Sequence, residues 1–163
     1  MEYLELFSKL EQFKVRYLIC GGLAVNIYGI PRMTADIDLL LDFTEKNVTD
    51  FETAIKILMY QSQLPISISK FVNKEERQKA IQEKNLIAYS FFNSRTNYMS
   101  LDVLLDVPIP FEELWKAKEE RAIDKFRVNL VSVQHLIELK KYANRKQDKE
   151  DVILLSKLLN NER

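Results

Sequence analysis

Two aspartates with one residue between them, Asp36 and Asp38, are the first residues of this sequence whose type and spacing indicate chemistry. The apolar segment 37–41 predicts a largely buried strand. Alternate side chains of a strand share a face, so both carboxylates would point the same way while Ile37 and Leu39 face the core. Adjacent carboxylates repel each other unless a cation lies between them, and hard oxygen ligands favour Mg²⁺ or Mn²⁺. The pair therefore predicts a divalent metal site.

The three glycines of the chain, Gly21, Gly22 and Gly29, all lie just before that pair. Segment 17–20 predicts a short strand that ends at the first two glycines, and segment 23–28 fits one face of a helix. A strand that enters a helix through two glycines leaves backbone N–H groups free at the positive end of the helix dipole. Phosphate suits such a position, because glycine also lets the backbone approach closely.

This combination resembles the nucleotidyltransferase superfamily that includes polymerase beta and the minimal nucleotidyltransferases. The run Gly-Gly-x-Ala, then Gly-x-x-Arg-x-Thr-x-Asp-Ile-Asp-Leu, over residues 21–39 is most similar to the prokaryotic branch related to abortive-infection and toxin–antitoxin nucleotidyltransferases. The resemblance implies an α/β (α+β) fold with a small mixed sheet, flanking helices and a C-terminal helical segment. It also implies transfer of a nucleoside monophosphate from a nucleoside triphosphate to an acceptor hydroxyl, with release of pyrophosphate and two Mg²⁺ or Mn²⁺ ions.

A third acidic residue is implied by the same resemblance, and Asp102 is the best match. Segments 86–92 and 98–105 predict an antiparallel hairpin with a polar turn over residues 93–97. Asp102 lies mid-strand between apolar neighbours, where a carboxylate is costly to bury without a partner. A strand residue that faces solvent is the alternative. Asp106 is the fallback, although its place at the strand end favours a role in the turn.

Five further residues receive roles from the resemblance. Gly21 and Gly22 would cradle the departing phosphates, Arg32 or Lys140 would neutralise their charge, and Asp148 would be an accessory acid. Many members have serine where this chain has Gly22, so backbone N–H groups would bind the phosphates without a hydroxyl. The alternatives are structural: Arg32 could pair with a carboxylate, Lys140 could favour a helix C-terminus, and Asp148 could cap the last helix.

The remaining pattern predicts helices over 2–14, 44–61, 74–84 and 111–122, an extended piece at 126–131, a helix capped by Ser132, and a last helix that ends near Leu159. We therefore expect one domain over 1–163, with a sheet-bearing catalytic core at 1–106 and a helical part at 110–163. The charged segment 74–84 is interpreted first as a solvated face. Acceptor binding by its four cations is the alternative: Lys74, Arg77, Lys79 and Lys84.

Composition limits the class of protein. The formal net charge is +0 over 163 residues with a pI near 6.6, which argues against a surface dedicated to nucleic acid. The single cysteine, Cys20, excludes an internal disulfide, fits a reducing cytoplasm, and is expected to be buried. No transmembrane run or signal segment is apparent, so we expect a cytoplasmic protein without membrane contact.

Three functions remain open. The first is an active enzyme that modifies tRNA or a protein hydroxyl, as part of a toxin–antitoxin or abortive-infection pair with a co-encoded protein. The second is a catalytically silent, antitoxin-like domain that binds a partner. The third is a modifier of small molecules that resembles aminoglycoside nucleotidyltransferases. Retention of three mutually repelling carboxylates, at Asp36, Asp38 and Asp102, favours an enzyme over a silent domain. A homodimer is possible in each case.

Overall fold

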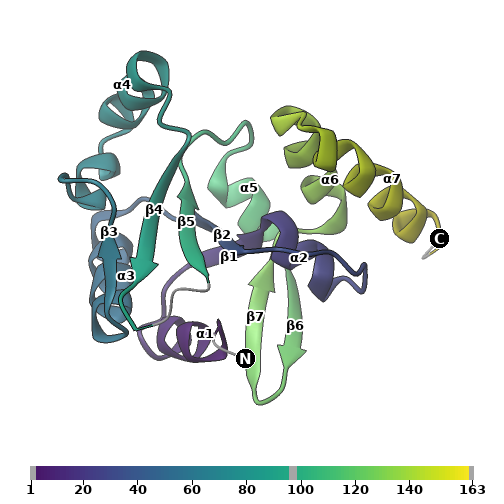
Figure 1. The fold of residues 1–163 in the computed structure, drawn as a ribbon, viewed down its shortest axis with the longest axis horizontal. Coiled ribbons are helices and arrows are strands. Elements are labelled where there is room, and N and C mark those ends of the chain that lie inside the picture. The colour runs from purple at the N-terminus through teal and green to yellow at the C-terminus, as the bar shows by residue number, and fades with distance from the viewer. Residues whose placement is uncertain (1–2, 96–98, 162–163) are drawn as a thin grey trace.

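A mixed seven-stranded sheet runs through the computed structural model, which describes residues 3–95 and 99–161 (Figure 1). Its strands are β1 (Tyr17–Cys20), β2 (Asp36–Leu41), β3 (Tyr60–Ser62), β4 (Ala88–Asn93), β5 (Ser100–Leu104), β6 (Glu119–Ile123) and β7 (Phe126–Leu130). The helices are α1 (Tyr3–Gln12), α2 (Gly21–Ile27), α3 (Glu45–Ile57), α4 (Lys74–Lys84), α5 (Phe111–Lys116), α6 (Val133–Ala143) and α7 (Lys146–Asn161), with a 3-10 helix, η1 (Ile68–Val72), before α4.

The strands are ordered β3-β4-β5-β2-β1-β7-β6, so β2 and β1 lie at the centre of the sheet. β1 runs antiparallel to β2 and parallel to β7, whereas β2 runs parallel to β5. All four residues of β1 are buried, as expected for a central strand covered on both faces. The register of β2 and β5 pairs Asp38 with Asp102. The central strands thus bring together two acidic residues that are far apart in the sequence.

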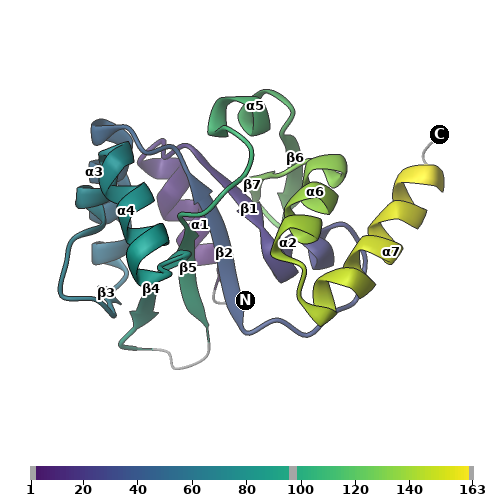
Figure 2. The same ribbon diagram turned by 90° about the horizontal axis from the view of Figure 1, so that it is seen from above.

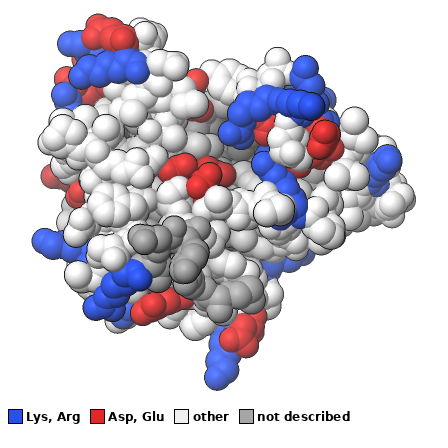
Figure 3. All heavy atoms as spheres, in the orientation of Figure 1, with Lys and Arg blue, Asp and Glu red and all other residues white. Residues whose placement is uncertain are grey.

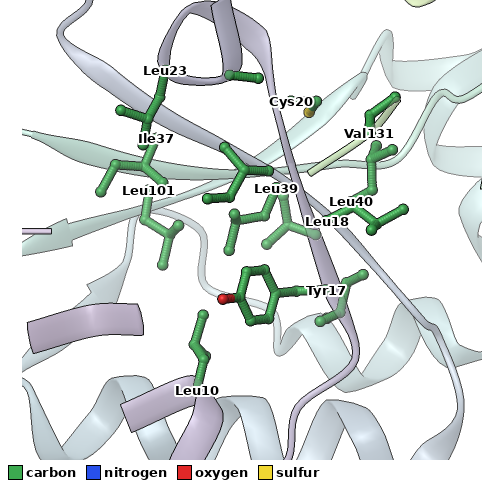
Figure 4. Packing of buried hydrophobic residues seen from close by; sticks show 14 of the residues in the cluster. Leu10, Tyr17, Leu18, Cys20, Leu23, Ile37, Leu39, Leu40, Leu101 and Val131 are labelled. Carbon is green, nitrogen blue, oxygen red and sulfur yellow. The ribbon is translucent and has the colours of Figure 1, made fainter. Parts of the chain in front are cut away.

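One face of the sheet is apolar and packs against α1 and α3. Tyr17 points from β1 toward α1, where its ring stacks on Phe7 with centroids 5.8 Å apart. Phe51 of α3 contacts Phe91 of β4 edge-on at 5.8 Å. Figure 4 shows Leu10 and Tyr17 on this side of the strands. Burial of these aromatic rings supplies much of the hydrophobic stabilisation of the core.

The opposite face carries the alternate side chains of β2 and β5, which include the three acidic residues. Figure 4 shows Leu23 of α2 on this side of the strands. Helices α6 and α7 lie together beyond α2, away from α3 and α4, in both views (Figures 1 and 2). This face is therefore covered only in part by apolar packing, and it leaves acidic side chains accessible.

Helix ends follow the capping chemistry of the sequence. The side chain of Asn73 accepts hydrogen bonds from the amides of Glu75 and Glu76 at the start of α4. Ser132 accepts from the amide of His135 at the start of α6, as predicted. Asn85 and Asn144 end α4 and α6 in the left-handed conformation that asparagine tolerates.

The mixed sheet with flanking helices confirms the predicted α/β class, but two predicted helix boundaries are wrong. The helix predicted to reach residue 61 ends at Ile57, and β3 follows it. The helix predicted over 111–122 ends at Lys116, because the rest of that segment pairs with β7 as strand β6. The sheet therefore continues beyond residue 106: β6 joins it in the part predicted at 110–163, and the predicted extended piece at 126–131 corresponds to β7.

Two other predictions have limited outcomes. The predicted polar turn and the start of its second strand include residues 96–98, which lie outside the described residues. Among residues 3–95 and 99–161, none of the helices has the length and apolar character needed to span a bilayer.

Candidate active site

The acidic residues of β2 and β5 meet across two neighbouring parallel strands. Asp38 is directly opposite Asp102, and Asp36 is opposite Ser100. Strands in a sheet lie about 5 Å apart, so carboxylates at paired positions on one face interact strongly. Figure 3 shows acidic atoms gathered near the middle of this face, with Lys and Arg atoms beside them toward α6 and α7.

The ionisation of these groups reflects their crowding. The pKa of Asp38 is raised to about 6. Burial is the largest cause, followed by the negative charges of Asp102 and Asp36. Lys140 and Arg145 act in the opposite direction. Burial also raises the pKa of Asp102, and the negative charge of Asp36 adds to this effect. The cluster is thus poorly compensated by the surrounding protein, which is typical of functional sites.

A buried carboxylate oxygen of the cluster has no hydrogen bond. Asp102 Oδ1 is buried and has no partner, although the neighbouring Ser90 hydroxyl lowers the pKa of the same carboxyl through a hydrogen bond. A buried acceptor without a partner costs free energy that a bound cation would relieve. The pair formed by Asp38 and Asp102 therefore fits a divalent cation.

Asp36 is engaged differently from the other two acids. Its Oδ1 accepts a hydrogen bond of 2.6 Å from Ser100 Oγ, the residue opposite it on β5. Within the described residues, no group of three or more His, Cys, Asp and Glu side chains has the geometry of a metal site as it stands. Sequence analysis thus anticipated three carboxylates on one face, but not that a serine would hold one of them.

The glycine bend at Gly21 and Gly22 packs closely against Asp38. Gly21 starts α2 with φ +63°, and a Cβ added there would lie 1.8 Å from Asp38 Oδ2. Any larger residue would therefore collide with the carboxylate as well as adopt a strained backbone. A Cβ at Gly22 would meet Thr34 Oγ1 at 2.8 Å, so the loop before β2 also packs on this turn. Cys20 provides no side-chain cap for α2. The bend thus brings helical N–H groups next to Asp38.

A second charged cluster links α6, α7 and the loop before β2. Lys140 Nζ lies 3.1 Å from Asp148 Oδ1 and 2.8 Å from Asp151 Oδ2. Arg32 also pairs with Asp151, and Arg145 Nε lies 2.8 Å from Asp148 Oδ2. Three cationic side chains thus share two carboxylates, which leaves positive charge in excess near Asp38. We call these five residues the charge network.

The charge network changes the roles expected for Lys140 and Asp148. Lys140 is only 4% exposed and is enclosed by two aspartates, so in this structure it influences Asp38 through its charge, not as an open phosphate contact. Burial alone would raise the pKa of Asp148, but hydrogen bonds from Arg145 and Lys140 outweigh it and lower the pKa. Asp148 also accepts from the Arg145 amide at the start of α7, in agreement with the capping alternative.

Sequence reasoning missed three residues of this region. Arg145 has a side chain that is 71% exposed, and its charge lowers the pKa of Asp38, yet its place near a helix end gives no sign of this in the sequence. Asp151 is 1% exposed and joins Arg32 to Lys140, although its sequence context indicated no more than a cap. Ser100 could have been recognised, because it shares a strand face with Asp102.

The other candidates take structural roles. Cys20 is buried, as predicted, and its Sγ lies 3.4 Å from the Asp38 carbonyl oxygen. Asp106 accepts hydrogen bonds from Tyr142 at 3.0 and 3.1 Å, away from the acidic pair on β2. The one histidine of the chain, His135, is no candidate and takes part in the cap of α6 with Ser132.

Several solved structures share this fold. The lincosamide antibiotic adenylyltransferase LnuA, in its lincomycin-bound form, aligns with a TM-score of 0.63 and 14% identity over 96% of each chain. ANT(2")-Ia in complex with adenylyl-2"-tobramycin aligns with a TM-score of 0.61 and 14% identity over 99% of this chain and 89% of the other. A candidate nucleotidyltransferase from Thermotoga maritima gives 0.59 and 16% identity over 99% and 94%. At these identities the likeness establishes the fold.

The family follows from the sequence as a whole. No curated protein sequence matches the chain. The model of a family described as "Nucleotidyl transferase of unknown function (DUF2204)" matches residues 1–163. Together with the Gly-Gly bend and the acidic pair on β2, this match means that the chain belongs to that nucleotidyltransferase family and is a nucleotidyltransferase enzyme.

Proposed function

We propose that this protein transfers a nucleoside monophosphate from a nucleoside triphosphate to the hydroxyl of an acceptor. The observation that carries the proposal is the pairing of Asp38 with Asp102 across β2 and β5, beside a glycine bend that only glycine fits. Two carboxylates with raised pKa values and an oxygen without a partner are poised to be neutralised by a cation. The triphosphate complex of a divalent metal would supply that charge.

Asp36, Asp38 and Asp102 are the residues that would hold two Mg²⁺ or Mn²⁺ ions. Such ions neutralise charge on the phosphates and lower the pKa of a bound oxygen. Asp36 would leave its hydrogen bond with Ser100 to join the other two acids, because a cation offers a carboxylate stronger attraction than a neutral hydroxyl does.

The proposed reaction requires no covalent bond between the protein and the substrates. The acceptor oxygen bonds to the α-phosphorus as the bond from that phosphorus to the α–β bridging oxygen breaks. Pyrophosphate leaves with the bonding electron pair, and the acceptor proton passes to solvent. Asp102 would assist this loss by holding an ion that lowers the pKa of the acceptor hydroxyl. Gly21 and Gly22 donate N–H groups to the phosphates, and alignment supplies much of the rate enhancement.

Positive charge for the triphosphate would come from the charge network. Arg145 is the member best placed to touch phosphate, since its side chain is 71% exposed while Lys140 is enclosed. Lys140 and Arg32, which both pair with Asp151, would attract the phosphates mainly through their charge, without direct contact. A guanidinium is well suited to bind phosphate oxygens in pairs.

A small-molecule acceptor is favoured over tRNA or protein. One similar structure is a lincosamide antibiotic adenylyltransferase, and another contains adenylyl-2"-tobramycin. A net charge of +0 also gives the chain no general attraction for RNA. Modification of tRNA or a protein as part of a toxin–antitoxin pair, and silent binding of a co-encoded protein, are retained as outcomes of the test.

The test incubates the protein with Mg²⁺ or Mn²⁺ and each α-labelled nucleoside triphosphate, together with separate RNA, protein and small-molecule fractions of a cell extract. A matched control carries Asp36→Ala and Asp38→Ala. Label that appears in one fraction only with the unmodified protein supports the proposal and names the acceptor class. Label in no fraction, without pyrophosphate release, contradicts it, and tight binding to a co-encoded protein would then support the silent alternative.

A further inference from the structure

A cavity of about 390 Å³ lies beyond the acidic pair, between β2, β5, α4 and α5. Its surface is mostly apolar, and its walls include Leu40, Leu104, Phe43, Ile109, Pro110 and Leu114. Among the described residues that line it, Lys74 and Arg77 of α4 are the only charged ones. This volume lies in the range of pockets that bind small molecules.

Two of the residues that line the cavity lie on the strands that carry the acids. Leu40 follows Asp38 by two residues on β2, and Leu104 follows Asp102 by two residues on β5. Because side chains two apart share a strand face, both leucines lie on the face that carries the two acids, about 7 Å further along the strands. A molecule that extends from the cavity along this face, past Leu40 and Leu104, would reach the carboxylates.

The cations of the cavity lack acidic partners. Within the described part of the chain, neither Lys74 nor Arg77 forms an ion pair with a carboxylate. The Arg77 guanidinium lies 4.8 Å from the centre of the Phe43 ring and donates to the carbonyl oxygens of Phe71 and Val72, the latter at 3.2 Å. Its burial lowers its pKa, with no acidic group to oppose the effect. The ring and carbonyls therefore fix a guanidinium whose charge is not compensated.

The positions of the charge network and the cavity indicate which of the two substrates, nucleotide or acceptor, would occupy the cavity. The charge network lies toward α6 and α7, where its excess positive charge matches a triphosphate. The cavity lies toward α4 and α5, and its apolar walls would leave phosphate oxygens poorly solvated. The nucleotide and the acceptor would thus approach the carboxylates from different sides.

We propose that this cavity is the acceptor subsite, and that the acceptor is a small molecule with an apolar body, a hydroxyl that reaches Asp38 and Asp102, and an anionic group bound by Lys74 and Arg77. The assignment rests on the proposed nucleotidyl transfer. It also excludes cationic acceptors, because two uncompensated positive charges would repel an ammonium group.

The test measures binding of three eight-carbon probes that differ only at one end: 8-hydroxyoctanoate, octane-1,8-diol and 8-aminooctan-1-ol. Binding is followed by NMR titration without nucleotide or metal. The hydroxy acid is expected to bind at least about tenfold more tightly than the diol, since the cations add charge-assisted hydrogen bonds. The amino alcohol is expected to bind most weakly.

Variants separate the cavity from general surface charge. Lys74→Gln changes an exposed side chain without a carboxylate partner, so the fold should be retained, and the preference for the hydroxy acid should fall several-fold. Lys79→Gln, on the exposed side of the same helix, is the matched control and should change nothing. Equal binding of all three probes, or an equal effect of both variants, would overturn the inference.

A second measurement keeps the two proposals distinct. Pyrophosphate release from ATP with Mn²⁺ is measured with and without 8-hydroxyoctanoate. Faster release supports the acceptor assignment. If the probes bind in the expected order but no acceptor in any extract fraction is labelled, the proposed transfer fails and the cavity loses its role as an acceptor subsite. If extract components are labelled while the hydroxy acid binds no better than the diol, only the present inference fails.

Discussion

Replacement of Asp38 by asparagine should stabilise the protein when no metal is present. The pKa of Asp38 rises from 3.8 to about 6 on folding, so the folded state binds a proton more tightly than the unfolded chain does. The ionised carboxylate therefore costs folding free energy above about pH 4, and the cost reaches its full value above about pH 6. A shift of about two units corresponds to about 3 kcal/mol. Asparagine keeps the shape and removes this cost.

The assay is urea unfolding in EDTA at pH 8 and at pH 4. At pH 8 the Asp38→Asn variant should unfold with a free energy about 2 to 3 kcal/mol higher than the unmodified protein, and its melting temperature should rise by roughly 5 to 10 °C. At pH 4 the difference should nearly vanish, because the carboxyl is then largely protonated in the folded protein. Added Mg²⁺ should stabilise only the unmodified protein.

Asp50→Asn is the matched control for this experiment. Asp50 is on α3 and pairs with Lys46 one turn away on the helix surface. Loss of such an exposed pair should change the unfolding free energy by less than about 0.5 kcal/mol at either pH. The reasoning is refuted if Asp38→Asn fails to stabilise the protein at pH 8, or if its stabilisation is as large at pH 4.

Three other predictions concern the support of the acidic residues. Gly21→Ala should abolish transfer. Gly29→Ala also places alanine at a positive φ, +91°, but its Cβ meets open space, so this variant should lose stability and keep its activity per folded molecule. Labelled-nucleotide assays and unfolding curves compare the two variants. Asp151→Asn should lower the unfolding free energy by about 3 kcal/mol, because the buried Lys140 and the half-buried Arg32 lose their shared carboxylate; equal urea midpoints would count against the charge network. Ser100→Ala should free Asp36 and tighten Mn²⁺ binding by a few-fold in calorimetric titrations; weaker binding would mean that the serine assists the metal.

The glycine bend and the acidic strand could be predicted because their signals are local. Residues 17–41 contain a strand, a helix that starts at two glycines, and a second strand, and strand periodicity alone sets Asp36 and Asp38 on one face. The position of Asp102 beside Asp38 could not be predicted from local sequence alone, since the parallel pairing of β2 with β5 depends on contacts between distant segments. Its alternation with Leu101 and Val103 nevertheless indicated the correct face.

Strand β6 could not be predicted from its own residues. Its sequence Glu-Glu-Arg-Ala-Ile favours helix, and three of its five residues are exposed at the edge of the sheet. Pairing with β7 overrides that local preference. Charged residues at a sheet edge also discourage association with other chains, which explains why an edge strand tolerates so polar a sequence.

The charge network was hidden for a different reason. On a helix, Lys140 and Asp151 are most simply read as solvated residues, and burial is evident only once α6 and α7 pack together. Arg32 joins Asp151 across 119 positions of sequence. Periodicity identifies which helix faces are apolar, but it does not identify which charged residues will be buried as partners.

Binding of Mn²⁺ together with α,β-methylene ATP, measured by electron paramagnetic resonance, tests the central claim most directly. The account predicts that the nucleotide tightens Mn²⁺ binding to the unmodified protein, and that Asp38→Asn and Asp102→Asn each weaken it at least about tenfold. The Asp106→Asn variant changes a carboxylate that accepts from Tyr142 and lies away from this cluster, so it should bind Mn²⁺ as the unmodified protein does. Equal Mn²⁺ affinity in all four proteins would contradict the assignment of these acids to nucleotidyl transfer.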